Sequence, residues 1–291
     1  MIEGIVTVLK PPAMSSSDVV VDVRKIFETK RVGHLGTLDP EAAGVLPVCV
    51  GRAVRLFDYL VDKRKTYLAE IVFGAATDTQ DAQGTVTETS GETVTEERLD
   101  AILPQFTGPI VQRPPMYSAL KFNGQKLYDL ALSGAEIPDK SREVQIFSLK
   151  RTETLGPNRF LLEVSCSRGT YIRTLCSDVG EALGVPAHMA FLLRTASGAF
   201  TLDDAFTIAE LQQMKEAGRL PETLISCEQA AVFLPRLDLR ADRRRPTVNG
   251  LPTRTNAADG TYRIYCGDFL GIGAVKNGEA MLKVHLYSEE L

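Results

Sequence analysis

The amino-acid sequence predicts an α+β protein, in which a large domain of helices and strands precedes a small all-β domain. Residues 18–27 have helical periodicity and lie between short apolar segments with the composition of strands. Residues 66–74 alternate in side-chain character as a strand does. Beyond Pro235 the chain contains only short alternating segments separated by turn residues, which is typical of an all-β domain.

Composition is that of a folded, soluble protein with a proper core. The 291 residues are 44% hydrophobic and 24% charged, without a run of eighteen apolar residues or a signal peptide. We therefore expect no membrane association. A net charge of −4 excludes a general polycation, so nucleic-acid binding must depend on local basic patches. The candidate patches are residues 24–25 with 30–31, residues 63–65, and Arg240 with residues 243–245.

The five cysteines have neither CxxC spacing nor another metal-binding pattern. They occur mostly in apolar surroundings, which indicates reduced thiols in the core and a cytoplasmic protein. The three histidines also lack ligand spacing, so we expect no metal. The cysteines are Cys49, Cys166, Cys176, Cys227 and Cys266.

The first elements follow from local patterns. Residues 5–9 are a short β-branched strand. Ser15 and Asp18 fit a capping box, so an amphipathic helix should begin near Asp18. Residues 44–51 are a continuous apolar run and are expected to form a buried strand.

Between that helix and the buried strand, residues 33–43 have neither helical nor strand periodicity. Two glycines allow unusual backbone angles, and Pro40 restricts the residue before it to extended geometry. We interpret this segment as a shaped loop that directs the carboxylate of Asp39. The alternative is that Thr37 or Asp39 simply closes a turn before Pro40.

The middle of the chain contains the strand at 66–74 and then a polar turn region at 74–84, whose two aspartates lack the further ligands of a calcium loop. Residues 104–140 are rich in proline and turns, with a short helix expected at 127–132. A strand at 160–165 leads into residues 169–175, which open a helix that ends at Gly184.

Arg173 falls in the first turn of that last helix, where a cation is unfavourable unless an anion lies nearby. Its partner is either Asp39 or a local carboxylate such as Asp178. A pair with Asp39 would keep that carboxylate ionised and fix its orientation.

At the C-terminal end, strands are expected around residues 262–265, 269–275 and 280–287. Asn277-Gly278 is a strong hairpin signal between the last two. These patterns give domains at residues 1–232 and 233–291.

The stretch Gly-His-Leu-Gly-Thr-Leu-Asp-Pro-Glu-Ala-Ala-Gly-Val-Leu-Pro-Val, residues 33–48, resembles the first motif of the tRNA pseudouridine-55 synthase family. The chain departs from the family's usual sequence at Ala13, where a glycine is common after Lys-Pro-x, and within this motif at Leu35, where threonine is common; neither replaces a chemically active group. The resemblance implies a pseudouridine synthase fold, with a mixed, largely antiparallel sheet flanked by helices. It also implies an RNA-gripping insertion at about 104–140, in which Leu132 replaces a common arginine, and a small C-terminal β-barrel of the PUA type.

The resemblance also assigns roles to individual residues. Asp39 is the catalytic residue, and Arg173 corresponds to the arginine that pairs with it. The residues expected to contact substrate are Tyr67 as an aromatic platform, Tyr171 near the same site, Leu192 against the flipped uracil, and His34 in the space that the base vacates. Lys10, Gly36 and Thr37 are expected to support the site.

The function implied is isomerisation of uridine 55 in the T arm of tRNA to pseudouridine, by a monomer that needs no cofactor and no obligatory protein partner. The target base must leave its stack to be reached. Two alternatives remain. One is an RNA-binding protein that folds tRNA, and the other is a phosphotransferase that uses an aspartyl-phosphate, although no GxxxxGK phosphate loop is present.

Overall fold

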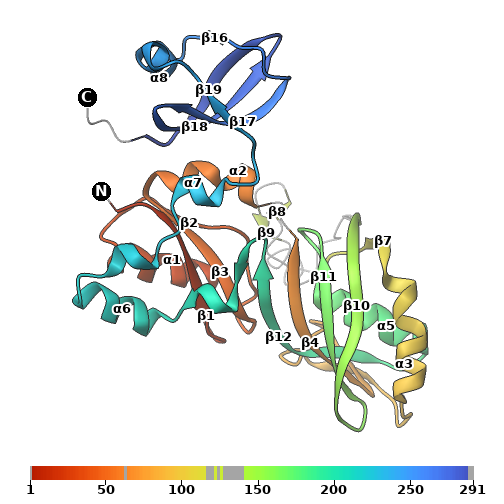
Figure 1. Ribbon diagram of the computed structural model, residues 1–291. Helices are drawn as coiled ribbons and strands as arrows, with labels where there is room; N and C mark the ends of the chain where they lie inside the picture. The colour runs from red at the N-terminus through yellow and green to blue at the C-terminus, as the bar shows by residue number, and fades with distance from the viewer. Residues whose placement is uncertain (1, 62–63, 116–120, 123–124, 127–140, 288–291) are drawn as a thin grey trace.

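The computed structural model describes residues 2–61, 64–115, 121–122, 125–126 and 141–287 (Figure 1). Its main feature is a ten-stranded sheet with helices packed against it, and a separate five-stranded sheet lies at the C-terminal end. The strands of the first sheet are β1 (Gly4–Lys10), β2 (Val32–His34), β3 (Ala43–Val50), β4 (Lys65–Phe73), β7 (Gly108–Gln112), β10 (Arg142–Gly156), β11 (Arg159–Cys166), β12 (Ala187–Ser197), β13 (Phe200–Thr201) and β14 (Ala205–Phe206).

The large sheet is mixed and largely antiparallel, as predicted. Its main path runs β14-β1-β3-β12-β4-β11-β10-β7, with β2 paired to β3 and β13 to β12. Only the β1–β14 and β3–β12 pairs are parallel. Two further two-stranded sheets pair β5 (Ala75–Thr77) with β6 (Val86–Thr89) and β8 (Lys121–Phe122) with β9 (Gln125–Lys126).

Helix α1 (Ser16–Ile26) covers one face of β1 and β3 together with α6 (Ile208–Glu216). The predicted capping box is present, because the Ser15 side chain accepts from the backbone of Asp18 and Asp18 caps the Ser15 backbone in return. The helix therefore begins at Ser16, two residues before the expected position. The apolar stripe of α1 is buried against Val6, Val8, Leu46 and Val48 of the sheet.

The other half of the sheet packs against α5 (Ile172–Leu183) and α3 (Glu96–Ile102), as Figure 1 shows. As predicted, α5 follows Tyr171 and ends at Gly184, whose φ of 71° is the left-handed conformation that glycine adopts most readily. The short helical segments are η1 (Gly51–Leu56), α2 (Phe57–Leu60), η2 (Leu103–Phe106), η3 (Leu202–Asp204), η4 (Leu220–Thr223), α7 (Cys227–Ala230), η5 (Ala241–Arg243) and α8 (Arg244–Val248).

The C-terminal sheet has the order β15-β17-β18-β19-β16. The predicted hairpin is confirmed: Asn277 and Gly278 both have positive φ and join β18 to β19. Within the described residues the edge strands β15 and β16 do not pair with each other, so hydrogen bonds do not close the sheet into a full barrel. The bounds are β15 (Arg236–Asp238), β16 (Thr253–Arg254), β17 (Gly260–Cys266), β18 (Asp268–Lys276) and β19 (Glu279–His285).

The two sheets share a core. Ile272 of the C-terminal sheet and Leu286, just after β19, are 0% and 5% exposed and belong to the same apolar cluster as Leu56 and Leu60. Arg55 adds a hydrogen bond from its side chain to the backbone oxygen of His285, at 2.9 Å. The C-terminal sheet is therefore packed against η1 and α2, the helical segments that follow β3, and Figure 1 shows α2 beneath this sheet.

Several expectations need correction. Residues 33–34 belong to β2, which pairs with β3, so the shaped loop begins two residues later than the sequence suggested. The polar turn region at 74–84 begins with a short strand, β5, because its backbone pairs with β6. The long strands β10 and β12 were not predicted as such. The expected helix at 127–132 and Leu132 lie outside the described residues.

All five cysteines are buried and free, as predicted. Burial raises the pKa of Cys49, Cys176 and Cys227 to about 12, so these thiols stay protonated and unreactive near neutrality. Among the described residues, no helix is long and apolar enough to cross a membrane.

Candidate active site

Asp39 lies in the loop that joins β2 to β3, and α1 holds this loop from one side. The Ser16 hydroxyl accepts a hydrogen bond from the backbone N–H of Leu38 at 2.9 Å and donates one to its carbonyl at 3.1 Å. Gly36 has a φ of 112°, which residues with a side chain rarely adopt. The loop next to the carboxylate is thus fixed by backbone contacts, with a glycine where the chain must turn.

Lys10 supports the same loop from β1. Its side chain is fully buried, and its ammonium donates to the carbonyls of Pro11, Met14 and Pro40 at 2.8, 2.5 and 2.8 Å. Burial lowers the pKa of Lys10 to about 8, although the carboxylates of Glu41 and Asp39 oppose this shift. Lys10 therefore ties Pro40, the residue after Asp39, to the start of α1.

Arg194, on β12, is a second buried cation beneath this loop, and sequence reasoning missed it. Its guanidinium donates to the carbonyls of Val45 at 2.7 Å and Gly36 at 3.2 Å, with a longer contact to Thr37 at 3.4 Å. The only signal in the sequence was an arginine inside an otherwise apolar strand pattern. A fully buried arginine needs several acceptors, and the loop carbonyls supply them.

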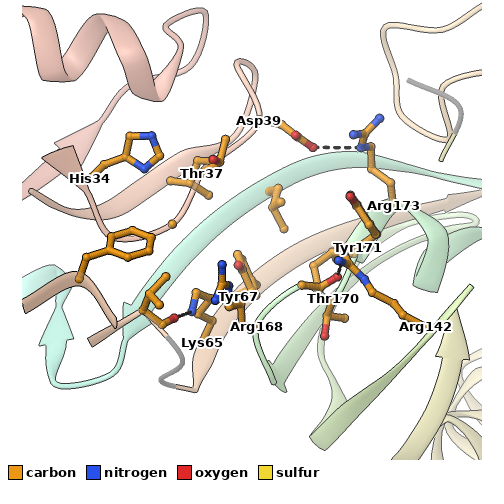
Figure 2. Close-up of a pocket in the computed structure, with 17 residues that line it drawn as sticks. His34, Thr37, Asp39, Lys65, Tyr67, Arg142, Arg168, Thr170, Tyr171 and Arg173 are labelled. Carbon is orange, nitrogen blue, oxygen red and sulfur yellow. Dashed lines mark hydrogen bonds and ion pairs between the residues drawn. The ribbon is translucent and has the colours of Figure 1, made fainter. Parts of the chain in front are cut away.

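Arg173 forms an ion pair with Asp39: its Nε lies 3.0 Å from Oδ2 of the carboxylate. Of the partners considered from the sequence, the structure places Asp39 rather than Asp178 against this guanidinium. The arginine side chain is 6% exposed and that of Asp39 is 44% exposed. The carboxylate is therefore held from the protein side and open to the pocket (Figure 2).

A second carboxylate contacts the same guanidinium. Asp81 Oδ2 lies 3.3 Å from Arg173 Nη1, which also donates to the Thr79 carbonyl at 3.1 Å. The sequence suggested that Asp81 serves turn chemistry, and it does, because its other oxygen accepts from Thr79 and Gln83. Its contact with Arg173 was not predicted.

The start of α5 is fixed by β7. The buried Gln112 side chain accepts from the Tyr171 backbone N–H at 2.9 Å and donates to the Tyr171 carbonyl at 3.1 Å. Arg142 lies over the Tyr171 ring, 4.8 Å from its centroid, and donates to the carbonyl of Gly169. These contacts orient the turn that carries Arg173 into the pocket.

The pocket encloses about 360 Å³, a size suited to a small ligand or a single base. Figure 2 shows His34 and Thr37 on one side and Tyr171 and Arg173 on the other. Of the residues singled out from the sequence, His34, Gly36, Thr37, Asp39, Tyr67, Tyr171, Arg173 and Leu192 line it, whereas Lys10 lies beneath the loop.

Tyr67 and Leu192 are each 7% exposed. Burial raises the pKa of the Tyr67 phenol, partly opposed by Arg194, so the hydroxyl stays protonated. Burial and Arg194 lower the pKa of His34, whose Nδ1 has no hydrogen-bond partner among the described residues. His34 and Tyr67 are therefore neutral, and the carboxylate that faces the pocket is that of Asp39.

A mixed sheet with a loop-borne aspartate, paired to an arginine at a helix start, is the arrangement that the resemblance to the pseudouridine synthases led us to expect. Comparison with known families agrees with this description. Residues 24–172 match the N-terminal domain of the TruB family of pseudouridylate synthases, and residues 173–231 match the tRNA pseudouridylate synthase B C-terminal domain. The chain belongs to the TruB family of pseudouridylate synthases.

Individual relatives are similar over most of their length. The chain is 46% identical to tRNA pseudouridine synthase B of Bacillus pumilus over 256 residues, which cover 86% of this chain and 83% of that protein. It is 47% identical to the protein of that name from Listeria welshimeri over 253 residues, 85% and 83% of the two chains. A chain in the solved structure of an H/ACA RNP bound to a substrate RNA containing 2'-deoxyuridine has the same fold, with a TM-score of 0.75 and 22% identity over 99% of this chain and 86% of that one.

Proposed function

We propose that the protein is a tRNA pseudouridine-55 synthase, which isomerises the uridine at position 55 in the T arm of tRNA. The observation that carries this function is the Asp39 carboxylate, which faces the pocket while Arg173 holds it at 3.0 Å. Family membership and the names of its relatives support the reaction and the tRNA substrate.

In this reaction the N1–C1′ bond of uridine breaks, the uracil rotates, C5 bonds to C1′ and loses its proton, and N1 gains a proton. The number of electrons does not change, so no redox cofactor is needed. Asp39 acts as the nucleophile, or as the base that starts glycal formation. Arg173 orients this carboxylate through the ion pair at 3.0 Å.

The other pocket residues position the base. Tyr67 provides the face on which the flipped uracil stacks, and Leu192 and Tyr171 bound the same space. His34 occupies the gap that the base leaves in the RNA. Lys10, Gly36 and Thr37 support the loop, and the carbonyl contacts of Lys10 and Arg194 are consistent with that role.

We propose a catalytic domain at residues 1–232 and a PUA-like RNA-binding domain at residues 233–291. The separate sheet that begins with β15, just after this boundary, supports the division. Residues 104–140 would grip the RNA. The protein would act in the cytoplasm as a monomer, without a metal, a cofactor or an obligatory protein partner, and the five free cysteines fit a reducing compartment.

The test uses a T-arm stem-loop RNA with tritium at uracil C5. Incubation with the protein should release tritium in proportion to the pseudouridine formed, and a hairpin with cytidine at the target position should release none. An RNA-folding protein without chemistry would bind the hairpin and release no label. Absence of release from an otherwise folded, RNA-binding protein would contradict the proposed activity.

A further inference from the structure

Phe57 lines the active-site pocket, yet its side chain remains 39% exposed. The two apolar side chains assigned to the flipped uracil, Tyr67 and Leu192, are only 7% exposed. The contrast places Phe57 at the rim of the pocket rather than at its floor. Exposed apolar side chains are common on protein surfaces, but one beside a ligand pocket is available for binding.

The backbone that carries Phe57 is firmly held. Val61 donates its backbone N–H to the Phe57 carbonyl at 2.9 Å, so the two residues lie one helical turn apart, and both line the pocket. Leu56 and Leu60 of the same segment are buried instead, in the cluster that includes Ile272 of the C-terminal sheet. One face of this segment is thus anchored in the core, and the other presents an aromatic ring to the pocket.

The surroundings of this ring suit RNA. Arg142 and Arg168 line the same pocket, and their positive charge favours an anionic ligand such as RNA. When the target nucleotide is flipped, its neighbours in the loop lose a stacking partner. Aromatic side chains stack readily on such unpaired bases, without strong preference for base identity.

We propose that Phe57 stacks on an unpaired base adjacent to the target uridine and contributes to RNA affinity rather than to the chemical step. The inference rests on the proposed function, because it takes the pocket to be the site of the flipped nucleotide. It differs from the roles above in that the ligand is a neighbouring base, outside the position occupied by the reacting uracil.

The first experiment measures binding and single-turnover rate for Phe57→Ala, Phe57→Leu and Phe57→Tyr with a T-arm stem-loop. Phe57→Ala should raise the dissociation constant by about 5- to 20-fold, as expected for loss of one stacked base. The saturated rate should change by less than about threefold. Phe57→Tyr should bind like the wild type, and Phe57→Leu should recover only part of the affinity. Phe233→Ala, at a ring that is 45% exposed and does not line the pocket, is the matched control and should bind normally.

The second experiment identifies the base. Two hairpins carry an abasic site, one on each side of the target uridine. For one of the two abasic hairpins, the wild-type protein should bind as weakly as Phe57→Ala binds the intact hairpin. Phe57→Ala should bind that abasic hairpin no more weakly than it binds the intact one. The proposal would be overturned if Phe57→Ala bound the hairpin as tightly as the wild type, or if Phe57→Leu recovered the full affinity. It would also be overturned if Phe57→Ala lost as much affinity on both abasic hairpins as on the intact hairpin. Failure of the proposed function would be visible separately, as absence of pseudouridine with the wild-type protein.

Discussion

The guanidinium of Arg173 bridges two carboxylates: Nε lies 3.0 Å from Asp39 and Nη1 lies 3.3 Å from Asp81. Asp39 comes from the loop before β3, and Asp81 from the turn after β5. The arginine therefore joins two separate loops at the start of α5. Its planar, multidentate donor set suits this geometry, which an ammonium group cannot reproduce.

Replacing Arg173 should reduce the chemical step more than RNA binding. In Arg173→Met the Asp39 carboxylate loses its orienting partner, so the single-turnover rate should fall by about 100-fold or more. Arg173→Lys should restore charge without the two-point contact and recover only part of the rate. Quench-flow measurements with a saturating T-arm hairpin provide the test, and an equal loss in both variants would show that geometry alone matters.

Asp81 should contribute through Arg173. In Asp81→Asn the amide oxygen can still accept the hydrogen bonds from Thr79 and Gln83, but the charge that faces the guanidinium is lost. We expect a rate lower by about 10-fold, corresponding to one charged hydrogen bond, with little change in melting temperature. In Arg173→Met the added Asp81→Asn change should have little further effect. Additive losses would contradict an action through Arg173.

Lys10 predicts a specific pH dependence of stability. The folded-state pKa of Lys10 is lowered to about 8 from 10.5, so between these values the unfolded chain binds more protons than the folded one. Stability from this group therefore rises with pH across that window. Relative to Lys10→Met, the wild type should gain about 1 kcal/mol of unfolding free energy per pH unit between about 8 and 10. Urea unfolding of both proteins at several pH values measures this, and a constant difference would show that the pKa is not shifted.

The shared core predicts that the two sheets unfold together. Ile272 is fully buried in the cluster that contains Leu56 and Leu60, so Ile272→Ala should cost about 2–5 kcal/mol. A single urea transition, followed by both far-UV circular dichroism and tyrosine fluorescence, should move to lower denaturant. Two separate transitions, with only one of them shifted, would show that the sheets fold independently.

This packing also changes how the C-terminal sheet should be tested. A truncation near Pro235 would remove the C-terminal sheet and would also expose Leu56 and Leu60 beside the pocket wall. The basic patch predicted at Arg240 and residues 243–245 also has part of its charge paired within the protein, because Arg240 pairs with Asp242 and Arg244 with Asp268. Single substitutions therefore test RNA binding more cleanly than truncation.

Local patterns predicted much of the fold. The capping box at Ser15, the αL glycine at position 184 and the Asn277-Gly278 hairpin all depend on residues close in sequence, and all three occur in the structure. The helix-start position of Arg173 predicted an anionic partner but left Asp39 and Asp178 as alternatives, and the family resemblance favoured Asp39, which the structure places against the guanidinium.

What the sequence missed depends on distant contacts. Asp81 has its turn contacts within the loop, and nothing local shows that its second oxygen reaches Arg173. Arg194 resembles any charge near the end of a strand until β12 is placed beside β3, where the loop carbonyls surround it. Phe57 was missed for the same reason, because only the packed structure shows which face of α2 lines the pocket.

The most direct test of the central claim is tritium release from a T-arm hairpin by Asp39→Asn and Asp39→Ala, with hairpin affinity measured in parallel. Both variants should release no label above the blank and should bind the RNA within about threefold of the wild type, because phosphate and shape contacts supply most of the affinity. Pseudouridine formation by either variant at a measurable rate would contradict the assignment of Asp39 as the reacting group.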